Sequence, residues 1–486
     1  MSSQSKMQAR TKLLQDASSR EWDIIIIGGG ITGAGIFRQA SQDGLKTLLI
    51  EKNDFGSGTS WCSSKLIHGG LRYLEQGKIH LVFESISERQ YLLQFAPALV
   101  KPLTFIFPVY KKSKRPLWLI YLGTWVYAAL SCFKNIPKKI TSDDIQNYSS
   151  KLTTTDFTGA VFYSDAVTTD TTLTLSCILS GQSDHALAVN HCAWLSHIEE
   201  SDFIRGIKAQ DQLTQQQYTF NAKWVINATG PWTDDPYKEI GKLTYSQGSH
   251  LLFKGNPFDL HSAITMSSND DGRILFCIPW KGHTLVGTTD TPSQQGPDSL
   301  KILEKEKQYL LDILAQYFPT IDIHSLPILS HFSGLRTLVR NSDKKLSQLS
   351  REHIVNVPKK GLVEVYGGKL TCFSKIALDV LHKFQALDNS PRSQKHEIPF
   401  VTPKEYKLET LDQAQIQHMI DYEYAMTVSD ILMGRTLAHL LLEDHGKNLY
   451  PLVCEVLQNN FGYSNEELED QIYTYQKLSQ QFTKTE

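Results

Sequence analysis

Three glycines near the start of the chain have a spacing that is typical of phosphate-binding turns. Gly28, Gly30 and Gly33 form the pattern G-x-G-x-x-G within the segment Trp22 to Lys52. The first glycine permits a tight turn, the second lets a pyrophosphate approach the backbone, and the third lets a helix pack closely on the preceding strand. The pyrophosphate would then lie at the start of that helix, near Thr32, where free N–H groups and the helix dipole favour an anion.

The elements that must position these glycines follow in the required order. Ile24 to Ile27 is a β-branched run without alternation, which predicts a strand of a parallel sheet that is covered on both faces. A second predicted strand, Thr47 to Ile50, leads to Glu51, whose carboxylate could accept hydrogen bonds from ribose hydroxyls. The alternatives are a glycine-rich turn in another α/β unit and the glycine loop of a protein kinase. The kinase alternative is less favoured, because this sequence has no downstream H-R-D motif.

Two later segments also end predicted strands with small residues. Lys223 to Gly230 ends in Ala-Thr-Gly, and Val363 to Leu370 contains Gly367 and Gly368. Glycines at strand ends allow a ligand to approach the backbone, although each could be merely a turn. We therefore expect one cofactor domain that is assembled from separated stretches, with a second domain inserted between them. The glycine motif itself does not distinguish FAD from NAD.

Composition limits the class of protein. The chain has 486 residues, of which 41% are hydrophobic and 21% charged, which is typical of a folded protein with two or three domains. The net charge of -2 provides no overall positive field, so we expect no nucleic-acid partner. Seven scattered cysteines without a C-x-x-C pair favour a reducing compartment and predict no metal site. No apolar run precedes Trp22, so we expect a cytoplasmic protein.

An ordered set of motifs resembles one enzyme family. The run SSKLIHGGLRYLE, from Ser63 to Glu75, closely resembles the FAD-dependent glycerol-3-phosphate dehydrogenases, a branch of the glycine-oxidase-like flavoenzyme superfamily. The resemblance covers about Asp23 to Lys375. Further blocks match this family in order: NATGPW (Asn227 to Trp232), GSH (Gly248 to His250), IPW (Ile278 to Trp280), GTTD (Gly287 to Asp290), SGLR (Ser333 to Arg336) and GGKLT (Gly367 to Thr371).

The resemblance implies a fold and an activity. The implied fold is α/β: a Rossmann-type FAD-binding domain like that of glutathione reductase, with an inserted mixed-sheet substrate domain and a C-terminal helical domain. The implied reaction oxidises sn-glycerol 3-phosphate to dihydroxyacetone phosphate, with a hydride passing from substrate C2 to flavin N5 and electrons then passing to a membrane quinone. The expected divisions are a polar extension at 1–20, an FAD-binding domain within 21–400 (about 21–84, 150–235 and 330–385), an interleaved substrate or cap domain (about 85–149 and 236–329), and a helical domain at 401–486.

Family positions imply roles for six residues. Arg72 and Arg351 would bind the substrate phosphate, because a planar guanidinium can meet two oxygens at once, and Tyr73 would add a hydroxyl. His250 would take the C2 hydroxyl proton, since imidazole titrates near neutral pH. Arg336 would stabilise the charge that develops on the C2 oxygen, and Lys369 would place a positive charge near the flavin N1–C2=O locus.

The same resemblance implies the residues that hold FAD, while His68 could also serve only to hold its loop. The expected cofactor-binding residues are Gly28, Gly30, Thr32, Gly33, Glu51, Ser63, Ser64, His68, Gly69, Gly70, Ala228, Gly230, Gly367, Gly368, Lys369, Leu370 and Thr371. Three other activities stay open: a soluble glycerol-3-phosphate oxidase that uses oxygen, an amine or amino-acid oxidase of the same superfamily, and a flavin-binding protein without catalysis. A homodimer is a further possibility.

The segment Pro116 to Phe133 has 18 residues without a charge and is flanked by lysines. A single membrane crossing would put Gly28 and Gly230 on opposite sides of the bilayer although one FAD must touch both, so we reject it. A buried helix and a helix lying in the lipid interface both remain. The resemblance favours the second, with the lysines on an anionic surface and the protein attached peripherally to the inner face of the cell membrane, where a quinone is accessible.

Local patterns predict a hairpin and several helix starts. Arg273 to Trp280 and His283 to Thr289 are typical of paired antiparallel strands. Capping boxes at Thr402 to Glu405, Thr427 to Asp430 and Ser464 to Glu467 predict C-terminal helices.

Overall fold

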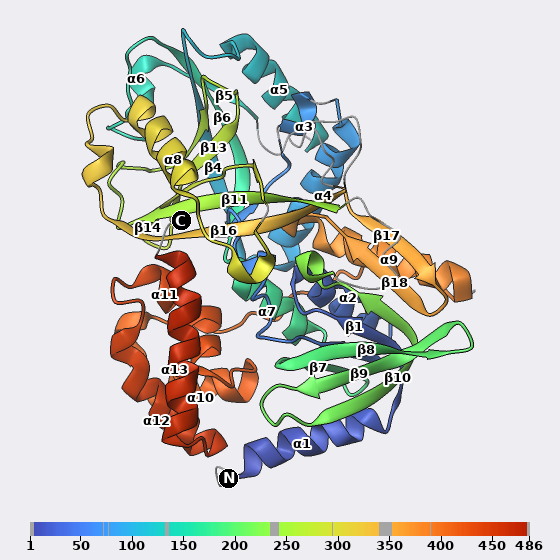
Figure 1. The fold of residues 1–486 in the computed structure, drawn as a ribbon. Helices are drawn as coiled ribbons and strands as arrows, with labels where there is room; N and C mark the ends of the chain where they lie inside the picture. Colours follow the sequence, from blue (N-terminus) through green and yellow to red (C-terminus); the bar gives the residue numbers. More distant parts are fainter. Residues whose placement is uncertain are drawn as a thin grey trace. The chain divides into compact units, whose positions relative to one another are not determined.

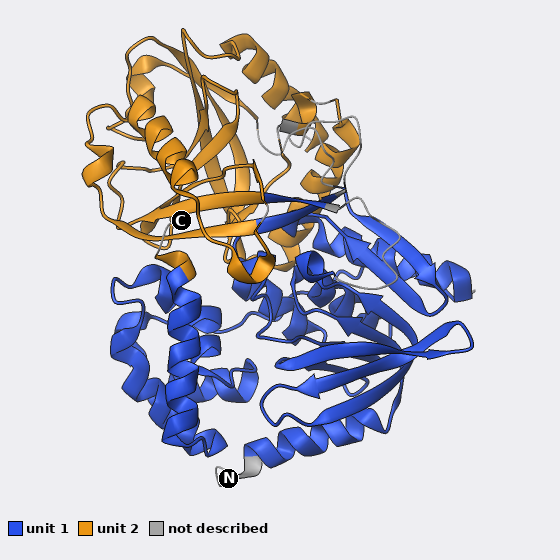
Figure 2. Cartoon of the chain, viewed as in Figure 1, with its two compact units in different colours: residues 1–62, 170–246, 335–480 blue, residues 63–169, 247–334, 481–486 orange. Residues whose placement is uncertain are grey.

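The structure is a computed structural model, and it divides into two compact units (Figure 2). Unit 1 comprises Met1–Cys62, Asp170–Ser246 and Leu335–Gln480, and unit 2 comprises Ser63–Thr169, Gln247–Gly334 and Gln481–Glu486. The division into an extension and three domains stays a prediction. The residues described are 4–70, 72–75, 77–131, 136–233, 243–293, 295–339, 352–388 and 390–483.

Unit 1 is built on an eight-stranded sheet. Its main strands are β17 (Ile354–Lys359), β18 (Leu362–Tyr366), β10 (Gln217–Asn227), β1 (Glu21–Ile27), β2 (Thr47–Ile50) and β7 (Ala186–Val189), in that spatial order. The pairs β18–β10, β10–β1, β1–β2 and β2–β7 are parallel, whereas β17 is antiparallel to β18. Two further antiparallel strands, β8 (Cys192–Glu200) and β9 (Phe203–Asp211), extend from β10. The two predicted strands at β1 and β2 are confirmed.

Helices cover both faces of this sheet, as the unalternating apolar strand at β1 requires. Helix α1 (Gln4–Ser18), inside the expected polar extension, packs Leu14 and Ala17 into one buried cluster with Ile25 and Ile27. Helix α2 (Ile31–Gln42) lies on the other face, near Ile26, and contacts α7 (Asp170–Ser180) and α9 (Phe373–Asp388). The dinucleotide-binding topology predicted from the sequence is therefore present.

The C-terminal part of unit 1 is helical. Helices α10 (Gln413–Tyr422), α12 (Tyr450–Phe461) and α13 (Asn465–Ser479) contact one another in sequence order (red in Figure 1). A short helix, α11 (Ala438–Leu441), follows a π-helix at Asp430–Arg435. The expected C-terminal helical region is confirmed.

Two of the three predicted capping boxes are confirmed. Ser464 caps α13 with Glu467, and Thr427 and Asp430 exchange side-chain-to-backbone hydrogen bonds. The box at Thr402 is wrong, because tertiary contacts hold that segment without a helix. The backbone N–H of Lys404 donates to Glu423 at 2.9 Å, and the first α-helix of the region starts only after its own cap at Asp412.

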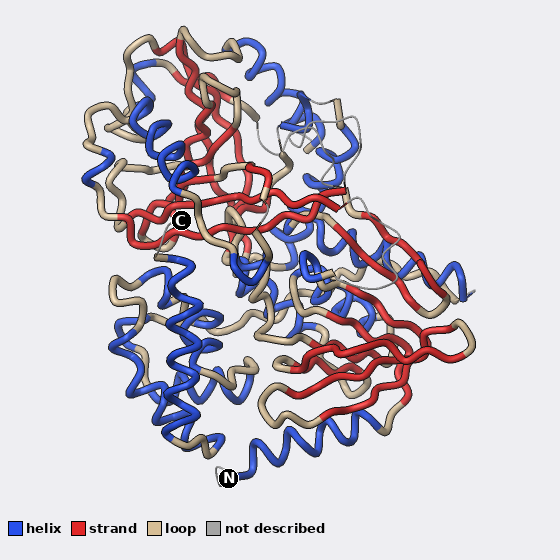
Figure 3. The backbone as a smooth tube through the Cα atoms, in the orientation of Figure 1, coloured by secondary structure: helices blue, strands red, loops and turns tan. Residues whose placement is uncertain are grey.

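Unit 2 contains most of a mixed ten-stranded sheet, of which β11 and β16 extend into unit 1 (Figure 3). The chain of paired strands is β15 (Thr291–Pro292), β11 (Leu243–Phe253), β14 (His283–Gly287), β13 (Ile274–Trp280), β12 (Ala263–Ser267), β4 (Val100–Tyr110), β6 (Phe157–Thr168) and β3 (Leu66–Ile67), with β16 (Ile328–Val339) on β11 and β5 (Lys138–Ile140) on β6. The predicted antiparallel hairpin at β13 and β14 is confirmed. Helix α8 (Glu304–Tyr317) buries Leu310 and Leu314 in the same cluster as the strand residues Ile264 and Val286.

The uncharged segment of unit 2 forms helix α5 (Leu117–Leu130), beside α4 (Ile79–Phe95). One side of α5 buries Ile120, Thr124, Tyr127 and Ala128. Its apolar residues Trp118, Leu119, Leu122 and Val126 are exposed. Among the residues that the structure describes, no helix has the length and apolar character needed to cross a bilayer.

Candidate active site

Four parallel strands of unit 1 bring the predicted cofactor residues to one edge of the sheet. β18, β10, β1 and β2 are neighbours in that order, and all point the same way. Their carboxyl ends lead respectively to Gly367, Ala228, Gly28 and Glu51. Open α/β sheets bind ligands outside the carboxyl ends of such strands. The structure therefore gathers residues that lie far apart in the sequence.

At this edge two glycines leave no room for a side chain. A Cβ on Gly33 would lie 1.9 Å from the carbonyl oxygen of Gly28, which is far inside van der Waals contact. Gly28 has φ +106°, and a Cβ there would lie 2.7 Å from the carbonyl oxygen of Ala228. The turn from β1 into α2 is thus tight, and it places the helix N-terminus directly beyond the strand, as a phosphate-binding turn requires.

The first turn of α2 has a side-chain partner that the sequence analysis did not name. Gly30 is the N-cap residue, in an extended conformation, and Thr32 lies in the first turn. The Ser60 hydroxyl accepts a hydrogen bond from the Ile31 N–H at 2.9 Å. The pattern around Ser60 contains no periodic signal that would have identified it, because the contact joins residues 29 positions apart.

Glu51 follows β2 and is held by backbone donors. Its two carboxylate oxygens accept hydrogen bonds from the Gly29 N–H at 2.7 Å and the Asn53 N–H at 2.9 Å. Burial raises the pKa of Glu51, and these two N–H groups oppose that shift. A fixed acceptor at the end of the second strand, together with the glycine turn, fits the ribose and pyrophosphate of a dinucleotide.

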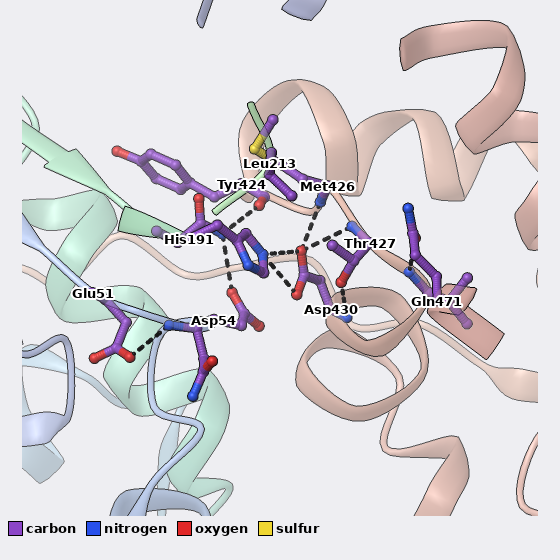
Figure 4. A network of polar contacts seen from close by, with 12 residues as sticks. Glu51, Asp54, His191, Leu213, Tyr424, Met426, Thr427, Asp430 and Gln471 are labelled. Carbon is purple, nitrogen blue, oxygen red and sulfur yellow. Dashed lines mark hydrogen bonds and ion pairs between the residues drawn. The ribbon is translucent and has the colours of Figure 1, made fainter. Parts of the chain in front are cut away.

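The loop between Glu51 and Ser60 is anchored to the C-terminal helical region by Arg435, and a second contact nearby joins His191 to Asp430 (Figure 4). The Arg435 guanidinium donates to both oxygens of the buried Asp54 carboxylate, at 2.5 and 2.9 Å. Close by, the His191 Nε2 lies 2.9 Å from the carboxylate of Asp430. The C-terminal helices therefore help to fix the loop that carries residues of the cofactor-binding edge.

The remaining described residues of the predicted site in unit 1 follow β18 and β10 or lie in β16. Gly367 and Gly368 adopt φ +74° and +95°, and a Cβ on Gly367 would lie 2.7 Å from the carbonyl oxygen of Glu352. Lys369 then caps the short 3-10 helix Leu370–Cys372, which contains Thr371. Arg336 is half-buried in the part of β16 that belongs to unit 1, and Gly230 starts a short helix after β10. Arg351 lies outside the described residues.

In unit 2, His250 is fixed by three neighbours. Its Nε2 lies 2.8 Å from the Ser64 hydroxyl, and its ring stacks on Phe332 with centroids 4.9 Å apart. On the neighbouring strand, Gly287 is paired with His250, and a Cβ there would lie 2.2 Å from the imidazole ring. The side chain is buried. The predicted cofactor residue Ser64 and the predicted base are thus direct partners.

Next to Ser64, a fully buried lysine was not predicted. The Lys65 Nζ lies 5.0 Å from the Phe332 ring centroid and 5.6 Å from that of Trp280, so both rings provide cation–π contacts. The Lys65 N–H also donates to the Ser63 hydroxyl at 3.0 Å. The sequence signal that could have identified it was a lysine directly before the apolar residues Leu66 and Ile67. A lysine next to such a buried pair is rarely buried itself unless other groups compensate its charge.

His68, Gly69, Gly70, Arg72 and Tyr73 also lie in unit 2. The half-buried His68 ring lies 6.1 Å from that of Phe276, and the Gly69 N–H donates to the Tyr127 hydroxyl at 2.9 Å. Gly70 has φ +74°. Arg72 starts helix α3 (Arg72–Glu75), and Tyr73 is buried in a cluster with Tyr127 and Leu81. The predicted site residues therefore form two groups, one in each unit.

Comparisons with known proteins identify the family. The family described as FAD dependent oxidoreductase matches residues 23–372. An aerobic glycerol-3-phosphate dehydrogenase of Staphylococcus haemolyticus is 33% identical over 380 residues, which cover 76% of this chain and 68% of the relative. A glycerol-3-phosphate dehydrogenase of Synechocystis is 30% identical over 95% of this chain and 96% of its own.

A solved structure has the same fold over the whole chain. The glycerol-3-phosphate dehydrogenase of Bacillus halodurans, complexed with FAD, superposes with a TM-score of 0.79 at 23% identity, covering 99% of this chain and 98% of that one. The predicted α/β class and the predicted family resemblance are therefore confirmed. The chain belongs to the FAD-dependent oxidoreductases and, within them, to the glycerol-3-phosphate dehydrogenase family.

Proposed function

We propose that this chain oxidises sn-glycerol 3-phosphate to dihydroxyacetone phosphate with FAD and passes the electrons to a membrane quinone. The observation that carries the proposal is the 30% identity to a glycerol-3-phosphate dehydrogenase along nearly the whole of both chains. The strand-end edge of unit 1, where Gly28 and Gly33 exclude side chains, supports it because it fits the dinucleotide part of FAD. FAD, when bound, supplies the acceptor for the substrate hydride.

The substrate phosphate would be bound by Arg72, Tyr73 and Arg351. A glycerol phosphate carries up to two negative charges, and arginine offers paired donors whose geometry matches two phosphate oxygens. Binding the phosphate fixes the distance from it to C2, so that the reacting carbon is oriented before reaction. Arg336 and Lys369 would add positive charge where negative charge develops on the C2 oxygen and on the cofactor.

His250 would accept the proton of the C2 hydroxyl. Its ring is already oriented by Ser64 and by stacking on Phe332, so little reorganisation is needed when a proton arrives. Proton acceptance at an imidazole nitrogen is favourable near neutral pH. Ser64 would then have two tasks, since it is both a proposed cofactor residue and the partner that holds the proposed base.

Helix α5 would attach the protein peripherally to the inner face of the cell membrane. Trp118, Leu119, Leu122 and Val126 are exposed together on this helix, and apolar and aromatic residues favour the headgroup boundary. Nearby lysines, such as Lys139 with its Nζ 4.5 Å from the ring centroid of Tyr121, would meet anionic headgroups. A lipid-soluble quinone would reach the reduced enzyme from this surface.

Anaerobic mixing of the flavin-loaded protein with glycerol 3-phosphate tests the proposal. We expect the oxidised flavin absorbance near 450 nm to be lost within seconds, and a soluble quinone analogue to restore it faster than oxygen does. Glycine and proline serve as control substrates and should leave the spectrum unchanged. A flavin that is bleached by an amino acid but not by glycerol 3-phosphate would contradict the proposal, and fast reoxidation by oxygen would contradict the quinone acceptor.

A further inference from the structure

The turn that leads to the proposed phosphate residues is held by a side chain of α5. The Gly69 N–H donates to the Tyr127 hydroxyl at 2.9 Å and lies 3.3 Å from the Asp165 carboxylate. A Cβ on Gly69 would lie 2.3 Å from the Tyr127 oxygen, so the backbone rests directly on this hydroxyl. The contact joins residues 58 positions apart, and it is buried.

A buried ion pair fixes Tyr127 in turn. Arg89, on α4, donates to the Tyr127 hydroxyl and to the Ser164 carbonyl, each at 2.9 Å, and forms an ion pair with Asp165. The Tyr127 hydroxyl donates to Asp165 at 2.5 Å. Burial, followed by the charge of Asp165, raises the pKa of Tyr127, which keeps this hydroxyl protonated. The oxygen thus accepts from two donors and donates to one acceptor, which is its full capacity.

A second tyrosine, Tyr73, also contacts this turn. Gly70 has φ +74°, and a Cβ there would lie 2.5 Å from the Tyr73 ring. The Tyr73 N–H donates back to the Gly70 carbonyl at 2.9 Å. The Tyr127 hydroxyl therefore holds Gly69, and the Tyr73 ring packs against Gly70, the next residue.

We propose that Tyr127, held by Arg89 and Asp165, is a positioning residue for the substrate phosphate. By fixing the N–H of Gly69 it holds the turn that precedes Arg72 and Tyr73, the proposed phosphate ligands. The inference rests on the proposed function, because it assigns these residues to phosphate binding. It also gives α5 two roles, since the helix that exposes apolar side chains on one side orients the substrate turn from the other.

The variant Tyr127→Phe tests this inference, because it keeps the ring in the core and removes only the hydroxyl. We expect the KM for glycerol 3-phosphate to rise about tenfold, which corresponds to about 1.4 kcal/mol, with kcat within about twofold of wild type. The Kd of dihydroxyacetone phosphate for the oxidised enzyme, measured by calorimetry without turnover, should rise by the same factor. Tyr121→Phe on the same helix is the matched control and should change neither quantity.

The possible results separate the positioning role of Tyr127 from the proposed function. A Tyr127→Phe enzyme with the wild-type KM and Kd, or one in which only kcat falls, would overturn the positioning role. Thermal unfolding and flavin content, measured on both variants, show whether either substitution causes a folding defect. If Tyr127→Phe does, Asp165→Asn is the second test, because it leaves the tyrosine in place, and it should also raise the KM for glycerol 3-phosphate. If wild-type flavin is not bleached by glycerol 3-phosphate at all, the proposed function fails, which is a different result.

Discussion

The two units build their parts of the predicted site in different ways. At the strand ends of unit 1 the backbone sets the shape, because Gly28 and Gly33 exclude any side chain and Glu51 is held by two backbone N–H groups. In unit 2 the predicted residues are held by side chains, as His250 is by Ser64 and Gly69 is by Tyr127. A cofactor common to a large family suits a backbone site, whereas a particular substrate requires particular side chains.

Buried polar networks extend this pattern in unit 2. Glu306 on α8 accepts hydrogen bonds from Ser249 and Thr289 at 2.7 Å and from Gln247 at 2.8 Å. Ser249 also lies 2.7 Å from the Ser333 hydroxyl. The carboxylate therefore joins the motif blocks that contain Ser249 and Thr289, and Ser249 links them to the block that contains Ser333. Such networks specify one arrangement of side chains when every member is satisfied.

The largest effect should come from filling the backbone site. In Gly33→Ala the new methyl group would overlap the Gly28 carbonyl, so α2 must move away from β1. We expect the purified protein to lose nearly all bound flavin, measured as the ratio of absorbance near 450 nm to that at 280 nm. Gly44→Ala is the matched control just beyond α2, where a Cβ meets nothing within 4 Å, and it should keep its flavin despite about 1 kcal/mol of backbone strain.

This contrast also explains how much could be predicted. The strands, the glycine turn and Glu51 follow from local spacing, because each element positions the next within about thirty residues. The sequence did not predict the roles of Ser60, Lys65 and Glu306. Their partners come from distant parts of the chain, and hydrophobic periodicity carries no information about such contacts. The capping box at Thr402 failed for the same reason, since a tertiary hydrogen bond from Lys404 to Glu423 competes with the helix.

The next effect separates binding of the cofactor from the chemistry. In His250→Gln the amide can still reach the Ser64 hydroxyl but cannot accept a proton. We expect normal flavin content and a substrate-driven reduction rate that is about 10²- to 10⁴-fold slower in anaerobic stopped flow, the usual contribution of a general base. His261→Gln, at an exposed site of the same unit, should reduce at the wild-type rate. A His250→Gln protein without flavin would instead place this residue in cofactor binding.

A smaller effect tests whether unit 2 depends on its polar networks. Glu306→Gln replaces a carboxylate that accepts from three side-chain donors with an amide that must turn its own N–H₂ toward one of them. We expect the free energy of unfolding to fall by about 3 kcal/mol, measured by denaturant titration with a probe in unit 2. Glu304→Gln is the matched control on the same helix, where an exposed carboxylate lies 3.7 Å from Lys307, and it should change stability by less than about 0.5 kcal/mol.

The smallest effect concerns a second anchor of the C-terminal helices in unit 1, the pair of His191 and Asp430, and its dependence on pH. Burial alone would lower the pKa of His191, but the charge and hydrogen bond of Asp430 raise it. Burial opposes ionisation of Asp430, but His191 lowers the pKa of that carboxyl. The raised histidine pKa gives stability that is present below about pH 6.5 and is lost as the pH rises through the folded value. The lowered aspartate pKa gives stability that is lost only as the pH falls below about 4.

A double-mutant cycle with His191→Gln and Asp430→Asn measures this anchor directly. The coupling free energy should be largest between about pH 4 and 6.5 and should decline at higher pH, by about 1.4 kcal/mol for each unit by which the histidine pKa is raised. The same cycle at His353 and Asp379, which are also 2.9 Å apart but more exposed, should give a smaller coupling free energy. Equal coupling at pH 5 and pH 9 for the buried pair would mean that packing, and not charge, holds the C-terminal helices against the segment that follows β7.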